Sequence, residues 1–109
     1  MAMVIRRGST PRITAKVLDD IDLTPITAVW LTISQGATDK KIVIDKVTSD
    51  LTISGKIVSV VLTQEETLSL VAGEMTYIQI RLLDGNDVAY VSQQGFISVE
   101  DILKEGVIV

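Results

Sequence analysis

Apolar and polar residues alternate along most of this 109-residue chain, and that alternation limits the fold more than any other feature. In "TAVWLTIS", Val29, Leu31 and Ile33 fall on one face of an extended strand, and Trp30 falls on the other. The same period of two recurs, between turn-forming residues, in "RITAKVL", "KKIVIDKV", "KIVSVVL", "TYIQIRLL" and "DVAYVSQQGFISV". This period indicates β-strands, and several short strands in about 100 residues favour a two-sheet sandwich.

We therefore expect one all-β domain, residues 1–109, with an immunoglobulin-like β-sandwich of six strands, or seven if "MVIRR" pairs as an edge. The chain is long enough to form a single core without disulfides or metals. The sequence "DGND", residues 84–87, predicts a hairpin turn, and Gly95 predicts a bulge or kink in the last long stretch.

Two short helices interrupt the strand pattern. In "LTQEETLSL", Thr63 and Glu66 have the spacing of a capping box, in which each side chain bonds the other residue's backbone N–H. We expect a helix near 63–70 to carry the chain from one sheet to the other, with Leu68 and Leu70 turned inward. A second helix is predicted near 99–105, in "VEDILKEG", where acidic residues begin the segment and a glycine ends it.

The composition argues against an enzyme. The chain has no histidine and no cysteine, which removes the most common general base and the thiolate ligands of metals. Glu65 and Glu66 are adjacent, so on a helix they point about 100° apart and cannot form a facing acid–base pair. We expect no catalytic residue and no cofactor.

Three segments invite a ligand-binding interpretation, and each has a simpler one. Asp19, Asp20 and Asp22 offer oxygen ligands for calcium, but the glycine turn and distal glutamate of a calcium loop are missing, which favours a solvated loop. The same argument favours a hairpin over a calcium site at "DGND". The sequence "RRGSTP" lacks the spacing of a phosphate-binding loop and is better explained as a bend after an edge strand.

Charge and hydropathy bear on the partners. The net charge of −4, without a basic stripe, argues against a nucleic-acid partner. The longest strongly apolar run, residues 57–62, is far shorter than the roughly 20 residues of a membrane span. Yet 47% of the residues are hydrophobic. We expect some of this apolar surface to be exposed on the single chain and covered by other subunits, most simply in a homo-oligomer.

The chemistry of a few side chains nominates interface residues. Arg6 and Arg7 follow an apolar stub and can face an acidic neighbour subunit. Trp30 and Tyr90 can stack on a sugar or contact a protein, although burial in the core is the more common fate of a sandwich tryptophan.

The segment "KKIVIDKV" is apolar on both of its expected faces. Ile42 and Ile44 should lie on one face, with Val43 and Val47 on the other. We expect Val43 and Val47 to belong to the outer face and to contact a partner.

Five segments, taken in order, resemble a family of short proteins encoded among phage and prophage tail and baseplate genes. They are "IRRGSTP", a strand ending in "SQ" (residues 34–35), "LTQEETLSL", "YIQIRLLDGNDV" and "VEDILKEGVI". The layout is also similar, more distantly, to the amino-terminal β-sandwich domain of phage baseplate upper proteins.

The resemblance implies a non-enzymatic structural component of the virion tail, assembled in the host cytoplasm. Its expected partners are other tail or baseplate proteins and further copies of itself. The alternative is a carbohydrate- or receptor-binding β-sandwich module, which would need a shallow face lined with aromatic residues. Only 4% of the residues are aromatic, which weakens that alternative.

Overall fold

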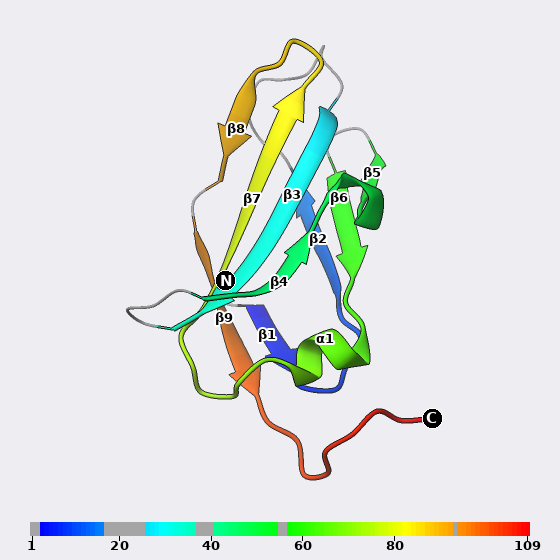
Figure 1. Ribbon diagram of the computed structural model, residues 1–109, viewed down its shortest axis with the longest axis vertical. Coiled ribbons are helices and arrows are strands. Elements are labelled where there is room, and N and C mark those ends of the chain that lie inside the picture. The colour runs from blue at the N-terminus through cyan, green and yellow to red at the C-terminus, as the bar shows by residue number, and fades with distance from the viewer. Residues whose placement is uncertain (1–2, 17–25, 37–40, 55–56, 93) are drawn as a thin grey trace.

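The computed structural model describes residues 3–16, 26–36, 41–54, 57–92 and 94–109, which form two facing β-sheets (Figure 1). In spatial order, the larger sheet contains β1 (Met3–Arg6), β9 (Gly95–Glu100), β7 (Thr76–Asp84), β3 (Ile26–Gln35) and β4 (Lys41–Lys46), and β8 (Ala89–Val91) also pairs with β7. The smaller sheet contains β2 (Arg12–Lys16), β6 (Ile57–Val61) and β5 (Thr52–Ser54).

The architecture is an all-β, immunoglobulin-like sandwich, as the alternation predicts. Strands account for 56% of the described residues and helices for 9%. Neighbouring strands are antiparallel except β1, which pairs with β9 in parallel, so that "MVIRR" is indeed an edge strand.

The core lies between the two sheets. The inward residues of β3 that the alternation predicted, Val29, Leu31 and Ile33, are at most 1% exposed. They meet residues such as Val58 and Val60 of the smaller sheet. Trp30 lies on the opposite face of β3, half exposed, and is therefore not a core residue.

The predicted crossover helix is present. Helix α1 (Gln64–Leu68) links β6 of the smaller sheet to β7 of the larger one. The N–H of Glu66 donates to Thr63 Oγ1 (3.1 Å) and the N–H of Thr63 donates to Glu66 Oε1 (2.8 Å), which completes the capping box. Leu70 is buried, as predicted, and Leu68 is partly buried.

The predicted hairpin at "DGND" is also present, between β7 and β8. The buried carboxylate of Asp84 accepts hydrogen bonds from the N–H groups of Asn86 (2.9 Å) and Val88 (3.0 Å). Asp87 adopts a φ of 60°, a conformation that Asp tolerates in tight turns. The acidic side chain at this turn therefore holds the backbone of its own loop.

Two predictions about element boundaries were wrong. The described residues contain nine strands rather than six or seven, because "TIS" (residues 52–54) pairs as β5 and the last long stretch divides into β8 and β9. The predicted helix near 99–105 does not form. Val99 belongs to β9, where it pairs with Ile5 and is 7% exposed, so burial in the sandwich prevails over helical spacing.

The faces of β4 also differ from the prediction. The β3–β4 register passes from the Ile33–Ile44 pair directly to the Ser34–Ile42 pair, so Val43 is an extra residue, a β-bulge. The bulge turns Ile42 outward, 59% exposed, while Ile44 is buried and Val43 packs against the core. Ile42, not Val43, is therefore the outward apolar residue of this strand.

Candidate interaction surface

The larger sheet turns one face away from the sandwich, and we call it the outer face. Its residues follow from the strand register and form three rows across the sheet. The ring row contains Phe96, Tyr77, Ser34 and Ile42. The polar row contains Gln79, Thr32 and Asp45. The tryptophan row contains Val91, Arg81 and Trp30.

Large apolar side chains on the outer face are well exposed. Phe96 is 60%, Ile42 59%, Val91 58% and Trp30 50% exposed. These residues lie at the four corners of the face, around the polar row. Single exposed apolar residues are common on any surface, but four large ones on one face of a sheet mark a candidate contact site.

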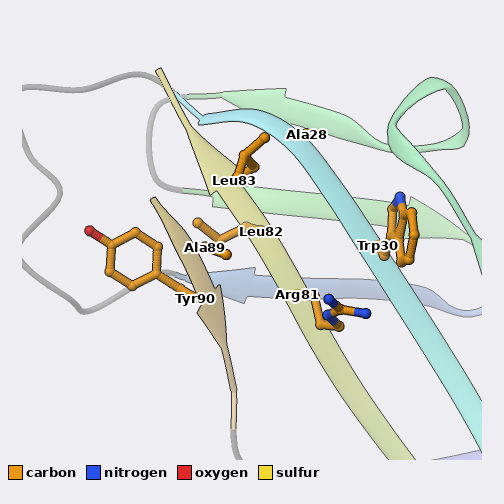
Figure 2. Close-up of a pocket in the computed structure, with 7 residues that line it drawn as sticks. All are labelled: Ala28, Trp30, Arg81, Leu82, Leu83, Ala89 and Tyr90. Atoms are coloured by element: carbon orange, nitrogen blue, oxygen red, sulfur yellow. The ribbon is translucent and has the colours of Figure 1, made fainter. Parts of the chain in front are cut away.

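Each end of the face contains an aromatic contact. The rings of Tyr77 and Phe96 lie 5.3 Å apart, tilted by 52°, as cross-strand aromatic neighbours. The guanidinium carbon of Arg81 lies 5.2 Å from the centre of the Trp30 ring. Figure 2 shows the Arg81 side chain extending from β7 toward β3 and Trp30. Phe96 and Trp30 are thus each held by a neighbouring side chain and remain exposed at the surface.

A shallow depression of about 170 Å³ lies beside Trp30, Arg81 and Leu83. Its lining is mainly apolar, with two alanines, Ala28 and Ala89, as its small residues. Pockets for drug-sized ligands usually measure about 300–1,000 Å³, so this one suits a side chain of a partner better.

Tyr90 also lines this depression, together with Leu82. It pairs with the inward residue Leu82 and packs against the core cluster that contains Val29 and Val58. Its hydroxyl donates to Asp84 Oδ2 at 3.4 Å. In Figure 2 its ring points away from Trp30 and Arg81. Trp30 therefore belongs to the outer face, whereas Tyr90 reaches the depression from β8 and packs against the core.

The opposite pole of the domain is rich in polar contacts. We call it the helix end: α1, the following residues to Leu70, and the carboxy-terminal segment 101–109. Arg7 is its centre, with Nε donating to the carbonyl of Leu70 (2.8 Å) and Nη2 to that of Leu68 (3.0 Å). Its Nη1 donates to Asp101 (2.6 Å) and Glu105. Arg7 thereby satisfies carbonyls at the carboxyl end of α1 and holds the segment after β9.

The charged groups of this cluster stabilise one another in their ionised forms. Hydrogen bonds to Glu105 and then Asp101 raise the pKa of Arg7 above its ordinary value. The N–H of Ile102, followed by Arg7, lowers the pKa of Asp101. Only 14% of the Arg7 side chain is exposed. The structure therefore commits Arg7 to contacts within the chain, and it is not the free interface cation that the sequence suggested.

Arg6, the preceding residue, has a different environment. It lies opposite Glu100 in the β1–β9 pair and forms an ion pair with it at 3.0 Å, with 70% of its side chain exposed. Arg6 therefore remains accessible, although it already has an acidic partner within the chain.

Two further contacts complete the helix end. The amide of Gln64 accepts from the N–H of Ile108 (2.8 Å) and donates to its carbonyl (3.4 Å). Lys46 Nζ lies 2.5 Å from Glu66 Oε2, which joins β4 to α1. Burial favours the neutral carboxyl of Glu66, but the hydrogen bonds from Lys46 and from the Thr63 N–H prevail and lower its pKa.

The remaining nominated residues are quickly placed. Val47, just after β4, is 40% exposed, as expected of a contact residue.

Asp19, Asp20 and Asp22 lie outside the described residues. Within the part of the chain that the structure describes, no group of three acidic side chains is arranged to hold a metal ion. No helix there has the length and apolarity needed to cross a membrane.

Comparison with known proteins adds little to the geometry. No protein-family model matches the sequence, and no curated protein does. Among solved structures, the chain is similar to the Ig-like domain of mouse leukocyte-associated immunoglobulin-like receptor 1, determined as a strand-swapped dimer (11% identity, 91% of this chain and 88% of that one, TM-score 0.48). It is also similar to the NK cell receptor Nkp44 (14% identity, 92% and 99% coverage, TM-score 0.45). Identities this low carry no information about function.

Proposed function

We propose that this domain is a non-enzymatic structural component of a phage or prophage tail or baseplate, and that it acts by packing its outer face against other protein subunits. The observation that supports packing most directly is the outer face itself, with four large apolar side chains 50–60% exposed at its corners. The resemblance of the sequence to tail and baseplate proteins suggests the kind of assembly. Such a component would join the virion tail in the host cytoplasm.

The face has the composition that a protein contact needs. Aromatic residues and arginine are enriched at protein interfaces, and Trp30, Phe96 and Arg81 supply them here. The polar row gives hydrogen-bonding groups at the centre, which fix the position of a partner. A carbohydrate-binding module would instead need a free aromatic platform, but Arg81 already lies over Trp30.

The proposal is tested with the proteins encoded by the genes that flank this one. Purified neighbours should bind the full chain, and Phe96→Asp or Ile42→Asp should weaken binding at least about tenfold, a loss of roughly 1.4 kcal/mol. Val61→Asp is the matched control, because Val61 is also an exposed apolar strand residue (45%) but belongs to the smaller sheet. Isothermal titration measures the affinities.

Two outcomes would refute the proposal. Equal effects of the Phe96 and Val61 substitutions would mean that the outer face is not the contact. Specific binding on a glycan array that is lost in Trp30→Ala, without binding to any tail protein, would favour the carbohydrate-binding module.

A further inference from the structure

We propose that the depression beside Trp30 binds an acidic residue of the partner protein together with an apolar group close to it. The apolar group fills the depression, and the carboxylate bonds to the guanidinium of Arg81. This inference rests on the proposed function, because it names the chemistry of the partner at one end of the same face. It follows from the shape of the depression and from the contacts of Arg81.

The shape of the depression follows from the order of small and large side chains. Ala28 of β3 and Ala89 of β8 lie opposite Leu83 of β7, one on each side, in the row next to Trp30 and Arg81. Two alanines beside larger side chains leave the depression of about 170 Å³ (Figure 2). A water molecule takes about 30 Å³ in the liquid, so there is room for about five or six heavy atoms, the size of one phenyl ring.

Arg81 has no acidic partner among the described residues. Its side chain is exposed. The ion pairs recorded in the described chain belong to Arg6, Arg7 and Lys46, and none includes Arg81. Its recorded contact, with the ring of Trp30 at 5.2 Å, uses no N–H donor. The planar fork of N–H groups matches the two oxygens of a carboxylate, which makes a carboxylate the complementary group at this position.

The spacing of the two features selects a ligand that combines both chemistries. Arg81 and Leu83 are two residues apart on β7 and share a face, so their side chains begin about 7 Å apart. Alternate side chains of an extended segment have the same separation. An acidic residue two positions from an apolar one, in a segment that runs along β7, therefore reaches Arg81 and the depression together.

The overall charge of the molecule makes this proposal easy to test. The chain has a net charge of −4, so its long-range field favours cations over anions. A ligand that binds better with a carboxylate than with an amine must therefore be selected by a local cation. At this end of the outer face, that cation is Arg81.

The probe is hydrocinnamate, a phenyl ring joined to a carboxylate by two methylene groups. Phenylpropanol is its neutral analogue and phenylpropylamine its cationic one. Hydrocinnamate should bind the full chain with a Kd on the order of 1–10 mM, as its size allows, and at least about fivefold more tightly than either analogue. Fluorescence of Trp30, the single tryptophan, measures the affinities. Amide NMR shifts should place the probe at Leu83 and Ala89.

Substitutions separate the two parts of the site. Arg81→Gln should bring the affinity for hydrocinnamate within about twofold of that for phenylpropanol. Ala89→Leu should fill the depression and weaken both probes at least about fivefold. Arg12→Gln is the matched control, because Arg12 is also an exposed strand arginine opposite an exposed apolar residue, Val61, but lies on the smaller sheet. It should leave both affinities unchanged.

The same variants test whether the ligand is part of a protein. Arg81→Gln should weaken binding of the flanking tail protein at least about fivefold and make that binding less sensitive to salt, whereas Arg12→Gln should do neither. Hydrocinnamate should compete with the tail protein for the wild-type chain.

Equal affinities of the wild type for hydrocinnamate and phenylpropanol would overturn the inference, as would equal effects of the Arg81 and Arg12 substitutions. A flanking tail protein that binds through Phe96 and Ile42 and ignores Arg81→Gln would refute this inference and leave the proposed function standing. Selective binding of hydrocinnamate that requires Arg81, without binding of any tail protein, would support the carboxylate site while the proposed function fails.

Discussion

At the helix end, charged and polar side chains bond to one another and to the backbone, whereas on the outer face large apolar side chains stand half exposed. Arg7 alone joins the carboxyl end of α1 to Asp101 and Glu105. On the outer face, the described contacts record two hydrogen bonds from the polar row, Thr32 to Asp45 at 3.3 Å and Gln79 Nε2 to the carbonyl of Ser92 at 2.9 Å. The polar side chains of the helix end bond to groups of their own chain. The large apolar side chains of the outer face remain exposed and available to another molecule.

The difference teaches that charge in the sequence is a poor guide to which side chains of this protein remain exposed. Arg6 and Arg7 are neighbours with the same side chain, yet one is 70% exposed and the other 14%. The residues that remain available for a partner are mainly apolar and lie on alternating positions of strands. A search for contact residues in proteins of this kind should begin from strand register.

The largest effect is expected when a core residue of the helix end is compared with an outer-face residue. Leu70→Ala should lower the free energy of unfolding by about 2–5 kcal/mol, because Leu70 is 1% exposed and its loss leaves a cavity. Phe96→Ala should lower it by about 1 kcal/mol or less in dilute solution, since only the pairing with Tyr77 is lost. Urea unfolding measures both.

The same two variants should exchange rank when association is measured. Isothermal titration with the flanking tail protein should show wild-type affinity for Leu70→Ala at temperatures where it is folded, and weaker binding for Phe96→Ala. If both variants lose this binding equally, the division between the two regions is wrong.

The two adjacent arginines give the next largest contrast. Arg7→Met should lower the urea midpoint several times more than Arg6→Met, because it removes the donor to the carbonyls of Leu68 and Leu70. Arg6 forms an exposed ion pair with Glu100, and such pairs contribute at most about 1 kcal/mol. Equal midpoints for the two variants would show that the Arg7 cluster does not stabilise the fold in solution.

The smallest effect concerns pH. The pKa of Glu66 is lowered below its ordinary value of about 4.5 in the folded chain, so its stabilising contribution is present above that pH and is lost as the pH falls through the lowered folded value. Glu66→Gln keeps the acceptor of the capping box and removes the charge. Its unfolding free energy should therefore depend less steeply on pH between about 5 and 3 than that of the wild type, by about 1 kcal/mol or less. An unchanged slope would exclude a contribution from the pair with Lys46.

Much of the fold could be predicted because it depends on local signals. The inward positions of β3, the capping box at Thr63 and Glu66, and the hairpin at Asp84 all lie within a few residues of the pattern that predicts them. The crossover role of α1 followed from the same reasoning, since a strand that ends one sheet must cross the sandwich to begin the other.

The wrong predictions depend on partners that are distant in the sequence. The pairing of Val99 with Ile5 prevents the helix near 99–105, and the segment alone does not reveal that contact. The ligands of Arg7 lie 94 and 98 residues further along the chain. The bulge at Val43 is set by register with β3 and moves every earlier residue of β4 to the other face. Of the residues nominated for contact, Trp30 and Val47 are exposed, whereas Arg7 bonds within the chain and Val43 packs against the core.

The bulge at Val43 also has a consequence for growth of the sheet. Among the described residues, β4 is the last strand of the larger sheet, and a regular edge strand is a template on which further chains can add without limit. An extra residue in the middle of the strand breaks the even spacing of its N–H and C=O groups and increases the local twist, and the exposed Lys41 adds charge at one end. A fibre needs a flat and repeating edge, which β4 does not offer. Because the bulge interrupts this edge, β4 is a poor template for fibrous growth.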